Sequence, residues 1–125
     1  GARAVSSMAP TIVLENGAPI VARGGSGGRH IATEVTQAAL ARLVFGFDPG
    51  ECVSAPRMYT NGSNLVVDRE VSEDTRAALR LRGETVSQEP FNGTGVQMIA
   101  WDRGNGAVRI LAASDPRKLG FAAAL

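Results

Sequence analysis

Short apolar runs separated by turn residues begin the chain, and they predict a β-hairpin. Residues 11–14 and 19–22 are rich in residues that favour strands, and residues 15–18 join them. Asn16-Gly17 in this connection tolerates the positive φ angles of a tight hairpin turn. We therefore expect two antiparallel strands, followed at residues 24–28 by a glycine-rich loop.

The spacing of apolar residues changes to a helical pattern after this loop. A segment rich in Ala and Leu runs from His30 to Gly46, which predicts a helix of about four turns. One apolar face consists of Ile31, Val35, Ala38 and Ala39. Further apolar residues spread around the helix, namely Leu40, Leu43, Val44 and Phe45. We therefore expect the helix to be covered on more than one side.

The rest of the chain alternates short strands with two further helices. Asp48 before Pro49 predicts a short helix that ends before Pro56, and Ser72 predicts the start of a helix that runs to Gly83. Strands are expected at 65–67, 85–88, 96–101 and 108–112, with a turn at 102–106 between the last two. The predicted order is ββααβαβββ. We expect residues 1–125 to form a single α/β (α+β) unit with a largely antiparallel sheet.

Composition and charge narrow the possible functions. Thirteen basic and twelve acidic residues leave a net charge of +1, which gives no electrostatic reason to bind nucleic acid or a membrane. No apolar run approaches the roughly 18 residues of a membrane span. One cysteine and one histidine cannot form a structural zinc site or an intrachain disulfide, so we expect no metal site.

The glycine-rich loop before the first helix is the strongest candidate for chemistry. Free N–H groups at a helix N-terminus attract negative charge, and glycine lets a phosphate, carboxylate or oxyanion come close. The loop lacks the spacing and the lysine of a nucleotide P-loop, since Arg29 follows Gly28. A purely structural turn remains an equal alternative from this pattern alone.

Other candidate residues carry weaker signals. The Ser6-Ser7 pair can bind a carboxylate, although such a pair is more often a solvated loop. Arg57 and Arg117 each follow a proline and can bind a carboxylate. The pattern favours ion pairs within the fold over binding of a substrate carboxylate. His30 is expected to be solvated rather than a catalytic base. Cys52 is expected to be a small buried apolar residue.

Five motifs in order resemble one family. They are SSMAPTIVLENG, GGSGGRHIATEVTQ, APR, NGTGVQMI and AASDPR, and they extend over nearly the whole chain, from Arg3 to about Lys118. Their order and spacing resemble the C-terminal part of the small subunit of γ-glutamyltransferases, also called γ-glutamyltranspeptidases or glutathione hydrolases.

The resemblance implies a fragment of an αββα N-terminal-nucleophile hydrolase sandwich. In that family a threonine formed by self-cleavage attacks a γ-glutamyl amide, and water or an amino acid accepts the acyl group. Carried over by motif, Ser6 and Ser7 would bind the substrate's α-carboxylate, and Gly27 and Gly28 would form the oxyanion hole. No cofactor is implied. The implied partners are a glutathione-like substrate, the acceptor, the rest of the small subunit and the large subunit, in a periplasmic or extracellular setting.

Two departures from the family pattern limit these expectations. Ser26 stands where the family often has proline, and the nucleophilic threonine with its supporting residues would precede Ser6. Gly1 cannot replace that threonine, because the chemistry needs a side-chain nucleophile. We therefore expect the 125 residues alone to be inactive, and to self-associate through a sheet or helix face that the missing segments would cover. A related cephalosporin or amide acylase and a non-catalytic binding module remain alternatives.

Overall fold

A computed structural model describes residues 1–60, 62–89, 93–104 and 106–123. Within these residues the elements follow the order β1 (Thr11–Glu15), β2 (Ala18–Ser26), a 3-10 turn η1 (Gly28–His30), α1 (Ile31–Leu43), α2 (Pro49–Ser54), β3 (Met58–Thr60), β4 (Leu65–Asp68), α3 (Glu73–Leu81), β5 (Val86–Glu89), β6 (Gly95–Gly104) and β7 (Ala107–Ser114).

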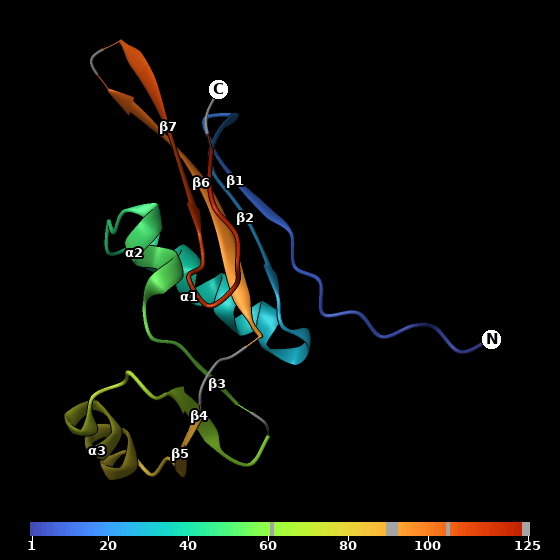
Figure 1. Cartoon of the computed structure of the whole chain (residues 1–125), viewed down its shortest axis with the longest axis vertical. Coiled ribbons are helices and arrows are strands. Elements are labelled where there is room, and N and C mark those ends of the chain that lie inside the picture. The colour runs from blue at the N-terminus through green and yellow to red at the C-terminus, as the bar shows by residue number, and fades with distance from the viewer. Residues whose placement is uncertain (61, 90–92, 105, 124–125) are drawn as a thin grey trace.

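The larger sheet is antiparallel throughout, in the order β1-β2-β6-β7. Helices α1 and α2 pack against one face of it (Figure 1). Since alternate residues of a strand point to opposite faces, every second residue of β2 and β6 meets the helices. The core between them consists of Val21, Val96, Met98 and Ala100 from the strands and Ile31, Val35, Ala38, Cys52 and Val53 from the helices.

The opposite face of the larger sheet is apolar but uncovered. Ile12 on β1 and Ile110 on β7 are 66% and 62% exposed, and Ile99 on the central strand β6 is 40% exposed. A groove of about 570 Å³ runs over this face, between the strands and the C-terminal residues Phe121 to Ala123. The sheet therefore has one layer of helices and one open apolar face.

The smaller sheet has the order β3-β4-β5. Strands β3 and β4 are antiparallel, whereas β4 and β5 are parallel and are connected through α3. Gln37 joins this sheet to helix α1: its side-chain amide donates to the Met58 carbonyl at 2.6 Å and accepts from the Met58 amide at 3.0 Å.

The structure confirms the predicted fold class, the hairpin, the three helices and the four later strands. Asp48 and Glu51 form the expected capping box of α2, and Ser72 caps α3 by accepting from the Thr75 amide. Gly46 adopts a positive φ of 72° just beyond α1, as expected for a helix stop. The fourth motif begins at Asn92 and the turn at 102–106 contains Asn105, and both residues lie outside the described ones.

Four expectations were wrong. The sequence pattern missed β3, so the smaller sheet and its parallel pair were not expected. The glycine-rich segment is not a loop from residue 24, because β2 continues to Ser26 by pairing with β6 as far as Gly95. The end of α1 is exposed rather than covered, with Leu40 and Leu43 at 47% and 45%. His30 is half-buried rather than solvated.

None of the helices within the described residues is long and apolar enough to cross a membrane.

Candidate active site

The end of β2 and the start of the first helix meet at a two-glycine turn, which we call the glycine turn and define as Gly27-Gly28. Gly27 has φ 147° and Gly28 has φ 61°, so both lie in the region that favours glycine. The turn leads directly into η1 and α1. This geometry places two consecutive backbone amides at the N-terminal end of a long helix.

The backbone hydrogen bonds near these two amides concern the carbonyl side of the turn. The His30 amide donates to the Gly27 carbonyl at 3.3 Å, which closes the first turn. Outside the helices and strands of the described residues, no backbone hydrogen bond has the Gly27 or Gly28 N–H as its donor. Free N–H groups at a helix N-terminus, where the helix dipole is positive, favour a negatively charged oxygen.

The two glycines differ in the space around them. A Cβ on Gly27 would lie 2.8 Å from both Cβ and Cγ2 of Thr94, so a side chain cannot be added without moving the backbone. A Cβ on Gly28 would meet no atom within 4 Å. Gly27 is therefore required by packing, whereas the side of Gly28 is open to a ligand.

Gly25 allows the helix to approach the strand. A Cβ at Gly25 would lie 3.2 Å from Cγ2 of Val35 and 3.3 Å from the Gly95 carbonyl oxygen. The glycine therefore sets the close packing of α1 on β2, and through it the position of the glycine turn.

Ser6 and Ser7 lie in the segment before β1, which has no regular secondary structure (Figure 1). Ser6 is exposed and its hydroxyl accepts from the Met8 amide at 3.3 Å, while Ser7 is half-buried. No hydrogen bond between described residues joins either serine to the glycine turn. Ser6 is therefore exposed and Ser7 half-buried, and within the described residues no hydrogen bond links the two predicted halves of the site.

His30 packs against the smaller sheet. Its ring stacks on Tyr59 of β3, with ring centroids 3.7 Å apart, and its Nδ1 lies 3.9 Å from a carboxylate oxygen of Glu34. Burial raises the pKa of Tyr59, and the negative charge of Glu89 adds to this shift. His30 and Glu34 follow the glycine turn in sequence, and the stacking on His30 brings Tyr59 of β3 beside them.

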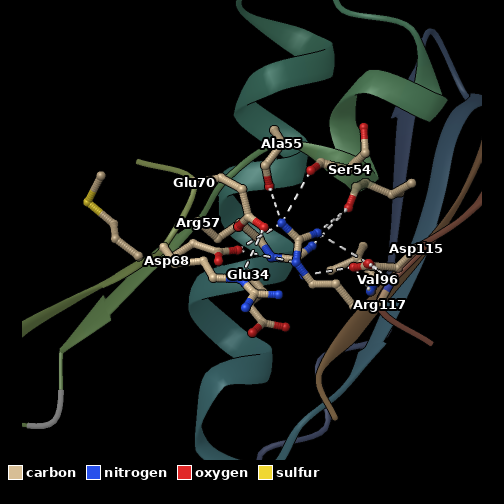
Figure 2. A network of polar contacts seen from close by, with 12 residues as sticks. Glu34, Ser54, Ala55, Arg57, Asp68, Glu70, Val96, Asp115 and Arg117 are labelled. Atoms are coloured by element: carbon tan, nitrogen blue, oxygen red, sulfur yellow. Dashed lines mark hydrogen bonds and ion pairs between the residues drawn. The ribbon is translucent and has the colours of Figure 1, made fainter. Parts of the chain in front are cut away.

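Arg57 and Arg117 form a buried ionic network with two aspartates (Figure 2). Arg57 pairs with Asp115 at 2.7 Å, and Arg117 contacts both Asp68 at 2.8 Å and Asp115 at 3.2 Å. Arg117 also donates to three carbonyls at the end of α2: those of Val53, Ser54 and Ala55. These contacts favour the structural interpretation of both arginines, because each guanidinium binds carboxylates of its own chain.

The network holds its aspartates in the charged form. Burial alone would raise the pKa of Asp115, but the amides of Arg117 and Val96 and the Arg57 guanidinium hold it below its ordinary value. The pKa of Asp68 is likewise lowered despite burial, by a side-chain hydrogen bond that it shares with the Glu70 carboxyl group, by the hydrogen bonds from Arg117 and by the charge of Arg117.

Sequence reasoning did not single out Glu34, Asp68 or Thr94. Asp68 was detectable in principle, since a carboxylate that directly follows the buried Val66-Val67 needs a partner. Glu34 lies on the same helical face as buried apolar residues, which is an unusual place for a carboxylate. Thr94 had no signal, because its contact with Gly27 depends on the tertiary fold.

Cys52 is buried in the core as expected, and burial raises the pKa of its thiol. The described residues contain no group of three or more His, Cys, Asp or Glu that could hold a metal ion.

Comparisons with known proteins extend over the whole chain. The sequence model of the gamma-glutamyltranspeptidase family matches residues 1–125. Glutathione hydrolase 2 from Arabidopsis thaliana is 33% identical, over 97% of this chain and 23% of that protein. The acylase ACY 1 proenzyme from Pseudomonas sp. (strain SE83) is 31% identical, over 82% of this chain and 18% of that protein.

The fold is similar to that of a solved structure from the same family. The gamma-glutamyltranspeptidase T380A mutant from Helicobacter pylori superposes with a TM-score of 0.84 and 30% identity, over 94% of this chain and 64% of that one. The chain therefore spans less than a quarter of the Arabidopsis relative and less than two thirds of the solved chain. With the family model, a relative and a solved structure in agreement, the chain belongs to the gamma-glutamyltranspeptidase family.

Proposed function

We propose that this chain is part of an enzyme that cleaves γ-glutamyl amides such as glutathione and passes the γ-glutamyl group to water or an amino acid. Because the relatives are several times longer, we assign the activity to a longer polypeptide that contains the chain, called here the parent enzyme. Within it, residues 1–125 act as a single unit that supplies the oxyanion-hole and carboxylate-binding half of the site.

The glycine turn is the observation that carries this proposal. A threonine nucleophile, which these 125 residues do not supply, attacks the γ-carbonyl carbon and forms a tetrahedral oxyanion. The Gly27 and Gly28 amides donate to that oxygen, and the N-terminal end of α1 adds its positive dipole. Each such donor typically stabilises the transition state by about 3 kcal/mol.

Ser6 and Ser7 complete the substrate half of the site. The hydroxyls of exposed Ser6 and half-buried Ser7 donate to the α-carboxylate of the γ-glutamyl group and hold the substrate in both the ground and transition states. The amine leaves the acyl carbon in the first step. Water or an amino acid attacks the same carbon in the second. Neither step requires a cofactor.

The parent enzyme also needs partners for this chain. The nucleophile and the residue that binds the substrate's α-amino group belong to the preceding part of the small subunit, and a large subunit completes the enzyme. The uncovered apolar face of the larger sheet supports this arrangement, since a sandwich would bury it against a second sheet.

An amide acylase is the second candidate, and the Pseudomonas acylase relative favours it. Such an enzyme would use the same oxyanion donors, but it would not need a pair of hydroxyls for an amino-acid carboxylate. The Ser6-Ser7 pair therefore favours γ-glutamyl substrates over acylase substrates.

A substrate comparison tests the proposal. The purified parent enzyme should hydrolyse a chromogenic γ-glutamyl anilide, and its kcat/KM for a cephalosporin side-chain amide should be far lower. The isolated 125-residue chain should give no turnover of the anilide. Preference for the cephalosporin amide would establish the acylase instead, and turnover by the chain alone, free of host enzyme, would contradict the assignment of the nucleophile to another segment.

A further inference from the structure

Glu34 is a buried carboxylate without a hydrogen-bond donor. Its exposure is 0%, and within the described residues neither of its carboxylate oxygens has a hydrogen-bond partner. The buried aspartates Asp68 and Asp115 differ, since each pairs with a guanidinium (Figure 2). An unpaired buried carboxylate is costly, so its retention on the apolar side of α1 needs a reason.

Among the residues that the structure describes, the cation-forming group within ion-pair distance of Glu34 is His30. Its Nδ1 lies 3.9 Å from the nearer carboxylate oxygen, one helical turn earlier on the same face of the helix. The opposite side of this imidazole is fixed by Tyr59, whose ring lies at an interplanar angle of 29°. The charges of Glu89 on β5 and of Arg29 act on Tyr59 in turn, in opposite directions on its pKa.

The ring held in this way belongs to the residue that closes the glycine turn. The His30 amide donates to the Gly27 carbonyl, so the backbone of His30 and the Gly27-Gly28 peptide move together. The negative charge of a carboxylate that faces Nδ1 favours the Nδ1–H tautomer and orients the imidazole. Tyr59 ties the same ring to the smaller sheet, which gives the turn a rigid support.

We infer that Glu34 is a positioning residue: its carboxylate, 3.9 Å from His30 Nδ1, attracts the Nδ1–H and holds the ring against Tyr59, which keeps the Gly27 and Gly28 amides aimed at the oxyanion. This inference rests on the proposed oxyanion role of the glycine turn. The carboxylate does not touch the substrate and acts only through His30.

Kinetics of the parent enzyme separate positioning from packing. Glu34→Leu removes the carboxylate but keeps the volume, and an apolar residue at this buried position is expected to leave the melting temperature unchanged or higher. We expect kcat to fall about tenfold with KM within twofold, as for a loss confined to the transition state. Glu34→Gln keeps a polar oxygen in the same place without the charge and should recover part of kcat, and Glu15→Gln in the exposed hairpin is the matched control.

A spectroscopic measurement tests the contact without any assay. His30 is the only histidine of the chain, so selective ¹⁵N labelling gives its imidazole signals alone. At about pH 8.5, where imidazole is ordinarily neutral, the Nδ1–H tautomer should dominate in the wild-type chain and give way to Nε2–H in Glu34→Leu. If that variant does not fold, the wild-type tautomer still decides the contact.

A wild-type Nε2–H tautomer, or wild-type kcat in a folded Glu34→Leu parent enzyme, would overturn the inference. Because the tautomer is read in the 125-residue chain, the result is independent of whether the parent enzyme acts on γ-glutamyl amides.

Discussion

Asp115 is buried, yet it keeps its charge. It accepts from the Val96 amide at 3.0 Å and the Arg117 amide at 2.9 Å, and it pairs with Arg57. Val96 lies in β6, Arg117 follows β7, and Arg57 precedes β3. A single carboxylate therefore connects three parts of the chain that are distant in sequence. Removing one partner of such a buried pair leaves an uncompensated charge in the interior.

We expect Asp115→Asn to lower the free energy of unfolding of the chain by about 3 to 5 kcal/mol. The pH dependence should change as well. Since the folded-state pKa of Asp115 is lowered, its contribution is fully present above the ordinary carboxyl pKa of about 3.9 and is lost as the pH falls through the lower folded-state value. Denaturant unfolding from pH 7 down to pH 3 measures both effects.

Glu73→Gln is the matched control, because Glu73 pairs with Arg76 and Arg80 on the exposed surface of α3. It should change stability little. An Asp115→Asn chain as stable as the control, or one with the wild-type loss of stability in acid, would show that the network does not support the fold.

At the scale of elements, local signals predicted most of the fold. Asp48 before Pro49 predicted the start of α2, and Ser72 before two acidic residues predicted the start of α3. Asn16-Gly17 predicted the hairpin turn. The continuation of β2 to Ser26 was not predictable, because glycines have low strand preference and only the pairing with β6 holds them extended.

Strand β3 was missed for a related reason. Only three residues long, Met58–Thr60 has no alternation of its own, and it is held by β4 and by the side chain of Gln37. Its existence is a tertiary effect that no local pattern shows. The same applies to the support of the glycine turn by Tyr59, which lies in this strand.

Gln37→Ala should loosen β3. The variant leaves the Met58 carbonyl and amide without their side-chain partner, and two such hydrogen bonds contribute on the order of 1 to 2 kcal/mol in total. We expect that loss in denaturant unfolding and faster hydrogen exchange at the Met58 amide. Thr36→Ala, at the neighbouring exposed position, should leave both unchanged, and an unchanged Met58 exchange rate in Gln37→Ala would refute this role.

At the scale of the whole molecule, the five motifs predicted the family, and the glycine turn was predicted as a candidate site. The position of Ser6-Ser7 relative to that turn could not be predicted from the sequence, because both residues lie in a segment without regular secondary structure. The open apolar face of the larger sheet could not be foreseen from strand patterns alone, since they do not say whether a face is covered.

This open face should make the isolated chain self-associate, because large exposed apolar patches favour association. We expect a dimer or larger species by light scattering at crystallisation concentration, and Ile110→Asp on β7 should shift it toward monomer. Leu81→Asp is the control, since Leu81 is 90% exposed on α3, away from the larger sheet. A wild-type chain that is a clean monomer at that concentration would contradict this expectation.

The most direct test of the central claim compares Ser7→Ala with Gly28→Ala in the processed parent enzyme. Gly28 is chosen because a Cβ there meets open space, although its φ of 61° adds strain of about 1 to 2 kcal/mol. Steady-state kinetics are normalised to folded, processed enzyme. Ser7→Ala should chiefly raise KM for a γ-glutamyl anilide, because the hydroxyl binds ground and transition states alike. Gly28→Ala should lower kcat by about 10²- to 10³-fold, because the new methyl group displaces the oxyanion from its donors. Unchanged KM in Ser7→Ala together with unchanged kcat in Gly28→Ala would contradict the assignment of both halves of the site.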